Sequence, residues 1–220
     1  MAVAVDAVTT GTSGGNPSFS HTCTGANLVL YVLIAQRYGT SGVTAVTYNS
    51  VAMTLLSDYD DANETHTFVY RLVAPATGAN TVGITQTDSR SLGYTAISCT
   101  GVDQVNPEGT IVQATGGGTA VSATVSSAVN DLVLDVLAWY RPVAETATVG
   151  AGQTQRQNTS HTTVGAASST EAGAASVAMT WTMSAAADWN QIAVPVKAGG
   201  AGGGAGALSA ALTTGFEDGN

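Results

Sequence analysis

Apolar and polar residues alternate along most of this 220-residue chain, the pattern of strands with one buried and one exposed face. The clearest example is residues 177–183, where Val, Met, Trp and Met alternate with Ala and Thr. Before position 206, no long stretch carries an apolar stripe at helical spacing. The pattern therefore predicts an all-β, antiparallel β-sandwich or barrel of about a dozen short strands. The predicted strands are residues 3–7, 28–35, 43–48, 51–56, 68–73, 81–85, 94–102, 120–126, 132–140, 147–155, 177–183 and 192–196.

One predicted strand, residues 28–35, is apolar on both faces, which is typical of a central strand covered on both sides. Residues 27–33 also read like residues 131–137, since both contain the run Leu-Val-Leu followed two residues later by Val-Leu. Either the chain contains a duplication, or two central strands of equivalent sheets have arrived at the same apolar composition. The sequence leaves both explanations open.

The chain divides by composition into a predicted β-sandwich domain, residues 1–198, and a tail, residues 199–220. Residues 1–17 form its N-terminal strand and loop, the loop being Gly11 to Pro17 (GTSGGNP). The tail is Gly/Ala-rich to Ala207 and then places Leu208, Leu212 and Phe216 at helix-like spacing. We expect these three residues to form an assembly interface.

Charge is scarce: 10% of residues are charged, against about 25% in ordinary soluble domains. Six Lys and Arg stand against fifteen Asp and Glu, for a net charge of -9. This composition argues against nucleic-acid binding and against a polybasic membrane anchor. The N-terminal residues lack the basic and apolar regions of a signal peptide, so we expect a protein that is made in the cytoplasm, exported by an unusual route or already trimmed.

Two cysteines, Cys23 and Cys99, allow one intramolecular disulfide. The favoured interpretation is two separate buried thiols, and the alternative is a bridge formed after release from the cell. Their separation offers no C-x-x-C motif and no zinc cluster.

Candidate catalytic and metal-binding residues are isolated. Ser13 lies in a G-x-S-x-G string without the strand–turn–helix setting of a hydrolase nucleophile. The three histidines, at positions 21, 66 and 161, share no metal-ligand spacing. The acidic segment 58–64 could hold Ca²⁺ through its oxygens, although it fails the EF-hand spacing. We therefore predict no catalytic residues, no cofactor and no metal site.

The aromatic residues Trp139, Tyr140, Trp181 and Trp189 are the candidates for stacking on sugar rings. Trp181 lies on the apolar face of its strand, so it is expected in the core. Trp139 is also expected to pack on a sheet, with a place at the rim as the alternative.

Four strings together resemble a β-sandwich family of bacteriophage virion proteins and phage-like bacterial genes. They are residues 18–30 (SFSHTCTGANLVL), 46–54 (VTYNSVAMT), 72–82 (LVAPATGANTV) and 98–107 (SCTGVDQVNP). The resemblance covers about residues 18–198 and differs at Ser50, where such hairpins more usually have glycine. It implies a jelly-roll-like module that decorates capsids or lies in tails and fibres.

The expectation is a non-enzymatic structural protein of a phage virion, most simply a capsid decoration protein. Its terminal segments, residues 1–8 and the tail from Ala198, would dock on neighbouring copies or on a major capsid or tail protein. The alternative is a carbohydrate-binding or adhesin module of a tail fibre or cell surface, stacking a surface glycan on Trp139 or Tyr140.

Overall fold

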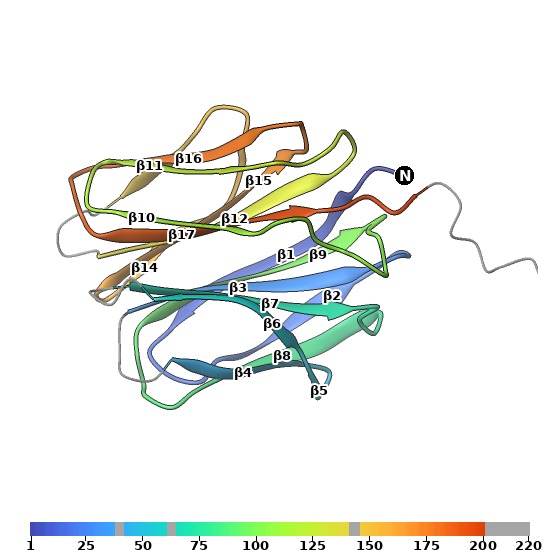
Figure 1. Ribbon diagram of the computed structural model, residues 1–220. Coiled ribbons are helices and arrows are strands. Elements are labelled where there is room, and N and C mark those ends of the chain that lie inside the picture. Colours follow the sequence, from blue (N-terminus) through green and yellow to red (C-terminus); the bar gives the residue numbers. More distant parts are fainter. Residues whose placement is uncertain (38–41, 61–64, 141–145, 201–220) are drawn as a thin grey trace, which may run out of the picture.

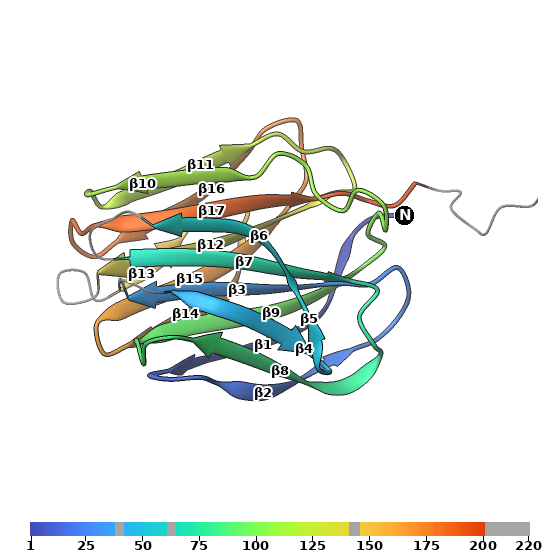
Figure 2. The same ribbon diagram turned by 60° about the horizontal axis from the view of Figure 1, so that its bottom comes forward.

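Four antiparallel β-sheets lie one above another in the computed structural model, which describes residues 1–37, 42–60, 65–140 and 146–200 (Figure 1). Their strands run along the long direction of the molecule (Figures 1 and 2). The all-β prediction is confirmed, and the layered arrangement is consistent with β-sandwich packing.

The first two layers are built from the first half of the chain. The first large sheet has the strand order β1-β9-β3-β7-β6, and the first small sheet has the order β2-β8-β4-β5. The strands are β1 (Ala4–Ser13), β2 (Ser18–Cys23), β3 (Val29–Arg37), β4 (Val43–Tyr48), β5 (Val51–Ala52), β6 (Thr54–Asp60), β7 (Thr65–Val73), β8 (Gly78–Gln86) and β9 (Leu92–Thr100).

The other two layers come from the second half of the chain. The second large sheet has the order β10-β17-β12-β15-β14, and the second small sheet has the order β11-β16-β13. The strands are β10 (Val112–Gly116), β11 (Ala120–Val125), β12 (Leu132–Tyr140), β13 (Ala147–Val149), β14 (Thr154–His161), β15 (Val164–Ala172), β16 (Val177–Met183) and β17 (Trp189–Val196).

Strand β3 shows how the layers are held together. Leu30, Val32 and Ile34 face the first small sheet, whereas Val29, Tyr31 and Leu33 face the second large sheet. Both sets are buried, as predicted for a central strand covered on both sides. Three apolar layers therefore alternate with the four sheets, and the middle one joins the two halves.

The two halves repeat one topology. The second-half strands β10 to β17 correspond, in this order, to β1, β2, β3, β4, β6, β7, β8 and β9 of the first half. With this correspondence the two pairs of sheets have the same strand orders, except that the short β5 has no counterpart. Strands β3 and β12 each have nine residues, and so do β7 and β15. Strand β6 carries a bulge between Leu55 and Ser57, and β14 carries one between Gln155 and Gln157.

The sequence echo between residues 27–33 and 131–137 is one residue out of register with this repeat. Val29 pairs with Cys99 and Val73, and Leu132 pairs with Val196 and Ala172, so Val29 corresponds to Leu132. The echo would instead match Val29 with Val133, which faces the opposite side of its sheet. The matching letters reflect the apolar composition of two central strands, whereas the repeated topology is established by the strand pairing.

A connecting segment, residues 101–111, ties the halves together at one end of the molecule. Glu108 accepts hydrogen bonds from Tyr31 Oη (2.7 Å) and Arg71 Nη1 (2.6 Å) of the first half. The Gly109 amide donates to Pro195 O (2.8 Å) of the second half. The connection is therefore part of the packed structure.

Several sequence-based boundaries were wrong. The predicted loop 11–17 begins too early, because β1 continues to Ser13 and Gly11 pairs with Tyr94, whose ring covers the position of a Cβ. Strand β15 was missed, since its sequence, VGAASSTEA, is too rich in small polar residues to show alternation. By contrast, the turn predicted at Asn49-Ser50 is confirmed, with φ of 49° and 63° at the two residues.

The two cysteines are free and lie in different apolar layers. Cys23 packs between the first small and large sheets, and Cys99 packs between the two large sheets. The interpretation as two separate buried thiols is confirmed.

The packing of Trp139 on its neighbour gives a test of the fold. Gly165 pairs with Trp139 across β12 and β15, and a Cβ at Gly165 would overlap the indole ring. We expect Gly165→Ala to lower the free energy of unfolding by about 1–3 kcal/mol, because the buried ring has to move. Chemical denaturation would measure this loss. Gly118→Ala is the control, since no described residue lies within 4 Å of its added Cβ. Equal effects of the two substitutions would contradict the prediction.

Candidate functional site

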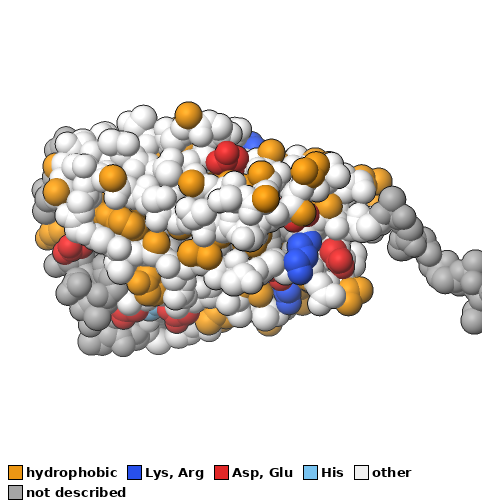
Figure 3. Space-filling model, turned by 45° about the horizontal axis from the view of Figure 1, so that its top comes forward, with side chains coloured by type: hydrophobic (Ala, Val, Ile, Leu, Met, Phe, Trp, Pro, Cys, Tyr) orange, Lys and Arg blue, Asp and Glu red, His pale blue; other side chains and the backbone are white. Residues whose placement is uncertain are grey.

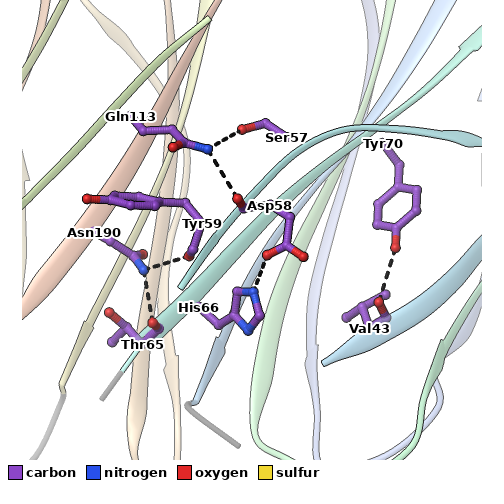
Figure 4. Close-up of polar contacts among 9 residues, drawn as sticks. All are labelled: Val43, Ser57, Asp58, Tyr59, Thr65, His66, Tyr70, Gln113 and Asn190. Carbon is purple, nitrogen blue, oxygen red and sulfur yellow. Dashed lines mark hydrogen bonds and ion pairs between the residues drawn. The ribbon is translucent and has the colours of Figure 1, made fainter. Parts of the chain in front are cut away.

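A histidine–carboxylate pair lies at the end of the β6–β7 hairpin (Figure 4). Asp58 Oδ1 contacts His66 Nε2, and the His66 ring stacks on Phe68 with a centroid separation of 4.0 Å. The Asp58 side chain is 47% exposed, whereas that of His66 is 10% exposed. Such a pair can orient a general base, but the other ring nitrogen, Nδ1, is buried and has no hydrogen-bond partner among the described residues.

The backbone around this pair is bonded to the second half of the chain (Figure 4). Gln113 Nε2 of β10 donates to Ser57 Oγ (3.0 Å) and Asp58 O (3.1 Å). Asn190 Nδ2 of β17 donates to Tyr59 O (3.0 Å) and Thr65 O (2.9 Å). These contacts hold the hairpin against the second large sheet. His66 stacks on Phe68, which faces the first small sheet, so the pair lies on the side of the hairpin away from the junction between the halves.

A second polar cluster surrounds the buried residues His21 and Ser98 between the first small and large sheets. His21 Nδ1 lies 2.9 Å from Thr9 Oγ1, and His21 Nε2 lies 3.2 Å from Ser98 Oγ. Ser98 Oγ donates to Asp6 Oδ2 at 2.7 Å, and Asp6 also accepts from the Thr24 amide at 2.8 Å. These contacts are consistent with a chain of hydrogen bonds in which Thr9 donates to His21, His21 donates to Ser98, and Ser98 donates to Asp6.

Serine, histidine and aspartate meet in this cluster without forming a catalytic triad. In a triad the carboxylate orients the histidine, which activates the serine. Here Asp6 accepts from Ser98 itself, and Ser98 is fully buried. Burial lowers the pKa of His21, an effect partly opposed by the nearby Asp6 carboxylate. The cluster is suited to cross-linking β1, β2 and β9.

The second half contains a fully buried carboxylate, Asp135 of β12. Its Oδ1 accepts from the Ser169 amide and hydroxyl, both at 2.6 Å. Its Oδ2 accepts from Trp181 Nε1 (2.6 Å) and Gln191 Nε2 (2.7 Å). Burial raises the pKa of Asp135, and these hydrogen bonds oppose the shift.

The remaining sequence candidates are placed as follows. Ser13 Oγ is engaged locally, accepting from the Gly15 amide at 3.1 Å. His161 lies near Gly14 but contacts Thr162 Oγ1 at 3.3 Å. The acidic segment contributes Asp58 to the pair with His66, while residues 61–64 are outside the described part of the chain. Leu208, Leu212 and Phe216 also lie outside it.

All three tryptophans are buried: Trp139 at 1%, Trp181 at 1% and Trp189 at 6% exposure. The placement of Trp139 at a rim, which the carbohydrate-binding alternative uses, is therefore wrong, and its packing on a sheet is confirmed. Tyr140 is partly buried, and the Arg37 guanidinium lies 4.8 Å from its ring centroid. The ring of Tyr140 is thus engaged within the molecule.

A depression lies beside the connecting segment, lined by Asp103, Asp131 and Lys197 among others. Asp131 Oδ1 accepts from the Ala198 amide (2.8 Å), and Asp103 Oδ1 accepts from the Val105 amide (2.8 Å). Backbone hydrogen bonds lower the pKa of Asp103. Both carboxylates therefore shape the loops that form the depression.

Within the described residues, no three His, Cys, Asp or Glu side chains are grouped so that they could hold a metal ion. The same residues contain no helix long and apolar enough to cross a membrane. Comparison of the chain with family models, curated proteins and solved structures found no match.

Sequence reasoning missed the residues that make the buried clusters. It considered His21 alone, because Asp6, Thr9 and Ser98 are distant in sequence and meet through strand pairing. Asp135 gave a detectable signal, since it interrupts an otherwise apolar strand. A carboxylate at such a position predicts a set of buried donors.

Asp135→Asn tests the buried carboxylate. The asparagine amide would direct its own N–H groups at the donors from Trp181 and Gln191. We expect the free energy of unfolding to fall by about 1–3 kcal/mol, as for a buried group that loses its partners. Urea denaturation would measure the loss, and a variant as stable as the parent would contradict the assigned hydrogen bonds.

His21 predicts a pH dependence of stability. Its pKa is lowered in the folded protein from an ordinary value of 6.5, so the unfolded chain takes up its proton first as pH falls. The stability contribution of neutral His21 is present above pH 6.5 and is lost as pH decreases toward the folded pKa. We expect His21→Gln to reduce the slope of unfolding free energy against pH by up to about 1.4 kcal/mol per pH unit. Parallel slopes of parent and variant below pH 6.5 would contradict it.

Proposed function

We propose that this protein is a non-enzymatic structural component of a bacteriophage virion, most simply a capsid decoration protein. The observation that carries the proposal is the composition of the two outer layers. The seven strands of the small sheets, β2, β4, β5 and β8 in one and β11, β13 and β16 in the other, contain no Asp, Glu, Lys or Arg. Their exposed positions are mainly Ser, Thr and Ala; Figure 3 views the molecule with the β11–β16 side turned toward the reader.

Such faces suit close packing against other proteins. Small side chains lose little conformational entropy when they are covered, whereas Lys and Glu lose about 1.5–2 kcal/mol each. Uncharged faces also avoid the cost of desolvating ions at a contact. A protein surrounded by copies or by a capsid lattice would gain from both effects.

We assign each half to the jelly-roll class. In the first half the pairs nest, with β1 beside β9, β2 beside β8, β3 beside β7 and β4 beside β5. In the second half, β10 pairs with β17, β11 with β16 and β12 with β15. First-with-last nesting across two sheets supports this assignment, and jelly rolls are a common architecture of viral capsid domains.

The position of the chain ends supports docking through the terminal segments. The Met1 amine donates to Gly199 O at 3.2 Å, and the Val3 amide donates to Asn130 O at 2.8 Å. The N-terminus and the start of the C-terminal tail therefore leave the body side by side (Figure 1). In the proposal, the tail carries Leu208, Leu212 and Phe216 to a neighbouring subunit.

Deleting residues 201–220 tests this role and leaves the described body intact. We expect the shortened protein to keep its stability but to be incorporated into particles at least about tenfold less, because a docking segment is missing. Particle composition after purification would measure incorporation. A control chain with a Gly/Ser tail of equal length separates loss of the apolar residues from loss of length. Unchanged incorporation of both variants would contradict the proposal.

A further inference from the structure

We infer that the chain is a fused dimer: two copies of one sandwich unit, joined covalently and packed through an isologous interface. The large-sheet face of each unit is then a surface that fits a second copy of the same unit. This inference concerns the interface between the halves and does not depend on the proposed virion role.

The equivalence of the units extends to backbone details that packing alone does not require. Asn27 before β3 and Asn130 before β12 correspond in the register, and both have positive φ, 51° and 77°. The bulges in β6 and β14 fall at corresponding residues when their partner strands β7 and β15 are aligned. Bulges and left-handed residues are position-specific features, so their recurrence indicates one repeated unit.

The contacts between the large sheets come in exchanged pairs. β3 packs on β15 and β12 packs on β7; β9 packs on β15 and β17 packs on β7. Likewise β9 packs on β14 and β17 packs on β6, while β3 packs on its own counterpart, β12. The packing of β1 on β14 is more extensive than its equivalent, β10 on β6, but exchanging the units reproduces each of the other pairs. This is the defining property of a two-fold interface, in which one patch meets its own equivalent.

Corresponding residues also meet at one end of the approximate two-fold axis that relates the two units. Arg37 is the last residue of β3, and Tyr140 is the last residue of β12. The two positions correspond in the register, and the Arg37 guanidinium lies over the Tyr140 ring at 4.8 Å. The axis therefore passes between the ends of β3 and β12, roughly parallel to the strands seen in Figures 1 and 2.

The two faces differ in ways that make them complementary. Gly93 of β9 packs closely on Ala166, and a Cβ there would overlap it. Its counterpart in β17 is Asn190, which bonds to Tyr59 O and Thr65 O of the first half. Tyr31 likewise corresponds to the smaller Leu134. The faces of the fused units have thus acquired different sizes and polar groups while keeping the two-fold arrangement.

An exchange of the pair at the axis tests the inference in the full chain. The double substitution Arg37→Tyr with Tyr140→Arg places each residue at the position of its symmetry mate, where the cation–π contact can form again. The single substitutions leave two tyrosines or two arginines facing each other. We expect the double variant to lose about two- to fivefold less in the folding equilibrium constant than the product of the two single losses predicts.

The matched control is Arg37→Leu with Tyr140→Arg, which places an arginine at position 140 without a ring opposite. Denaturant unfolding of the parent, the singles, the double and the control gives the coupling. Recovery in the exchanged pair but not in the control supports the two-fold arrangement. Additive losses in the exchanged pair, or equal recovery in the control, would overturn it.

A permuted chain gives a second measurement that does not rely on this pair. Residues 110–199 would precede residues 1–109, using the contact between the Met1 amine and Gly199 O as the new junction. If the units are equivalent, either order is compatible with the same dimer-like packing, so a folded monomer with cooperative unfolding is expected. An insoluble or non-cooperative chain would overturn the inference, because the order of the units would then matter.

Discussion

The packing of two large sheets against each other is the constraint on which the rest of this molecule depends. Each large sheet has a neighbour on both sides, so its central strand is buried on both faces. In β3 this requires an unbroken buried run from Val29 to Ala35. The alternation of apolar and polar residues that is typical of a surface strand occurs instead in the small sheets, which cover the outer faces of the large sheets.

This constraint explains which parts of the fold could be predicted from sequence. Strands with one exposed face, such as β16, alternate clearly, and the doubly covered β3 stood out as a continuous apolar run. Strand β15 is also covered on both sides but is built mainly from Ala, Ser, Gly and Thr, because Gly165 must leave room for the Trp139 ring and Ala166 packs directly on Gly93. The small residues of β15 are explained by the residues that pack on it, and these lie elsewhere in the sequence.

The repeat shows a related limit. Sequence similarity between residues 27–33 and 131–137 pointed to the correct pair of strands but to the wrong register. Leu, Val and Ile satisfy a buried site on either face, so an apolar strand can slip by one residue without changing its composition. The register was instead marked by features that single residues do not reveal, namely the bulges near Leu56 and Arg156 and the pairing of β3 with both of its neighbours.

The buried polar groups differ between the two halves, and this has a physical reason. A buried polar side chain needs specific partners, so the clusters around His21 and around Asp135 each hold one sandwich in one arrangement. The position in β3 that corresponds to Asp135 is Val32, and β17 has Pro195 where β9 has Ser98. If the cores of the two units were interchangeable, either small sheet could pack on either large sheet. Distinct buried networks favour the pairing of each large sheet with its own small sheet, and complementary contacts such as Gly93 on Ala166 favour one arrangement of the two large sheets.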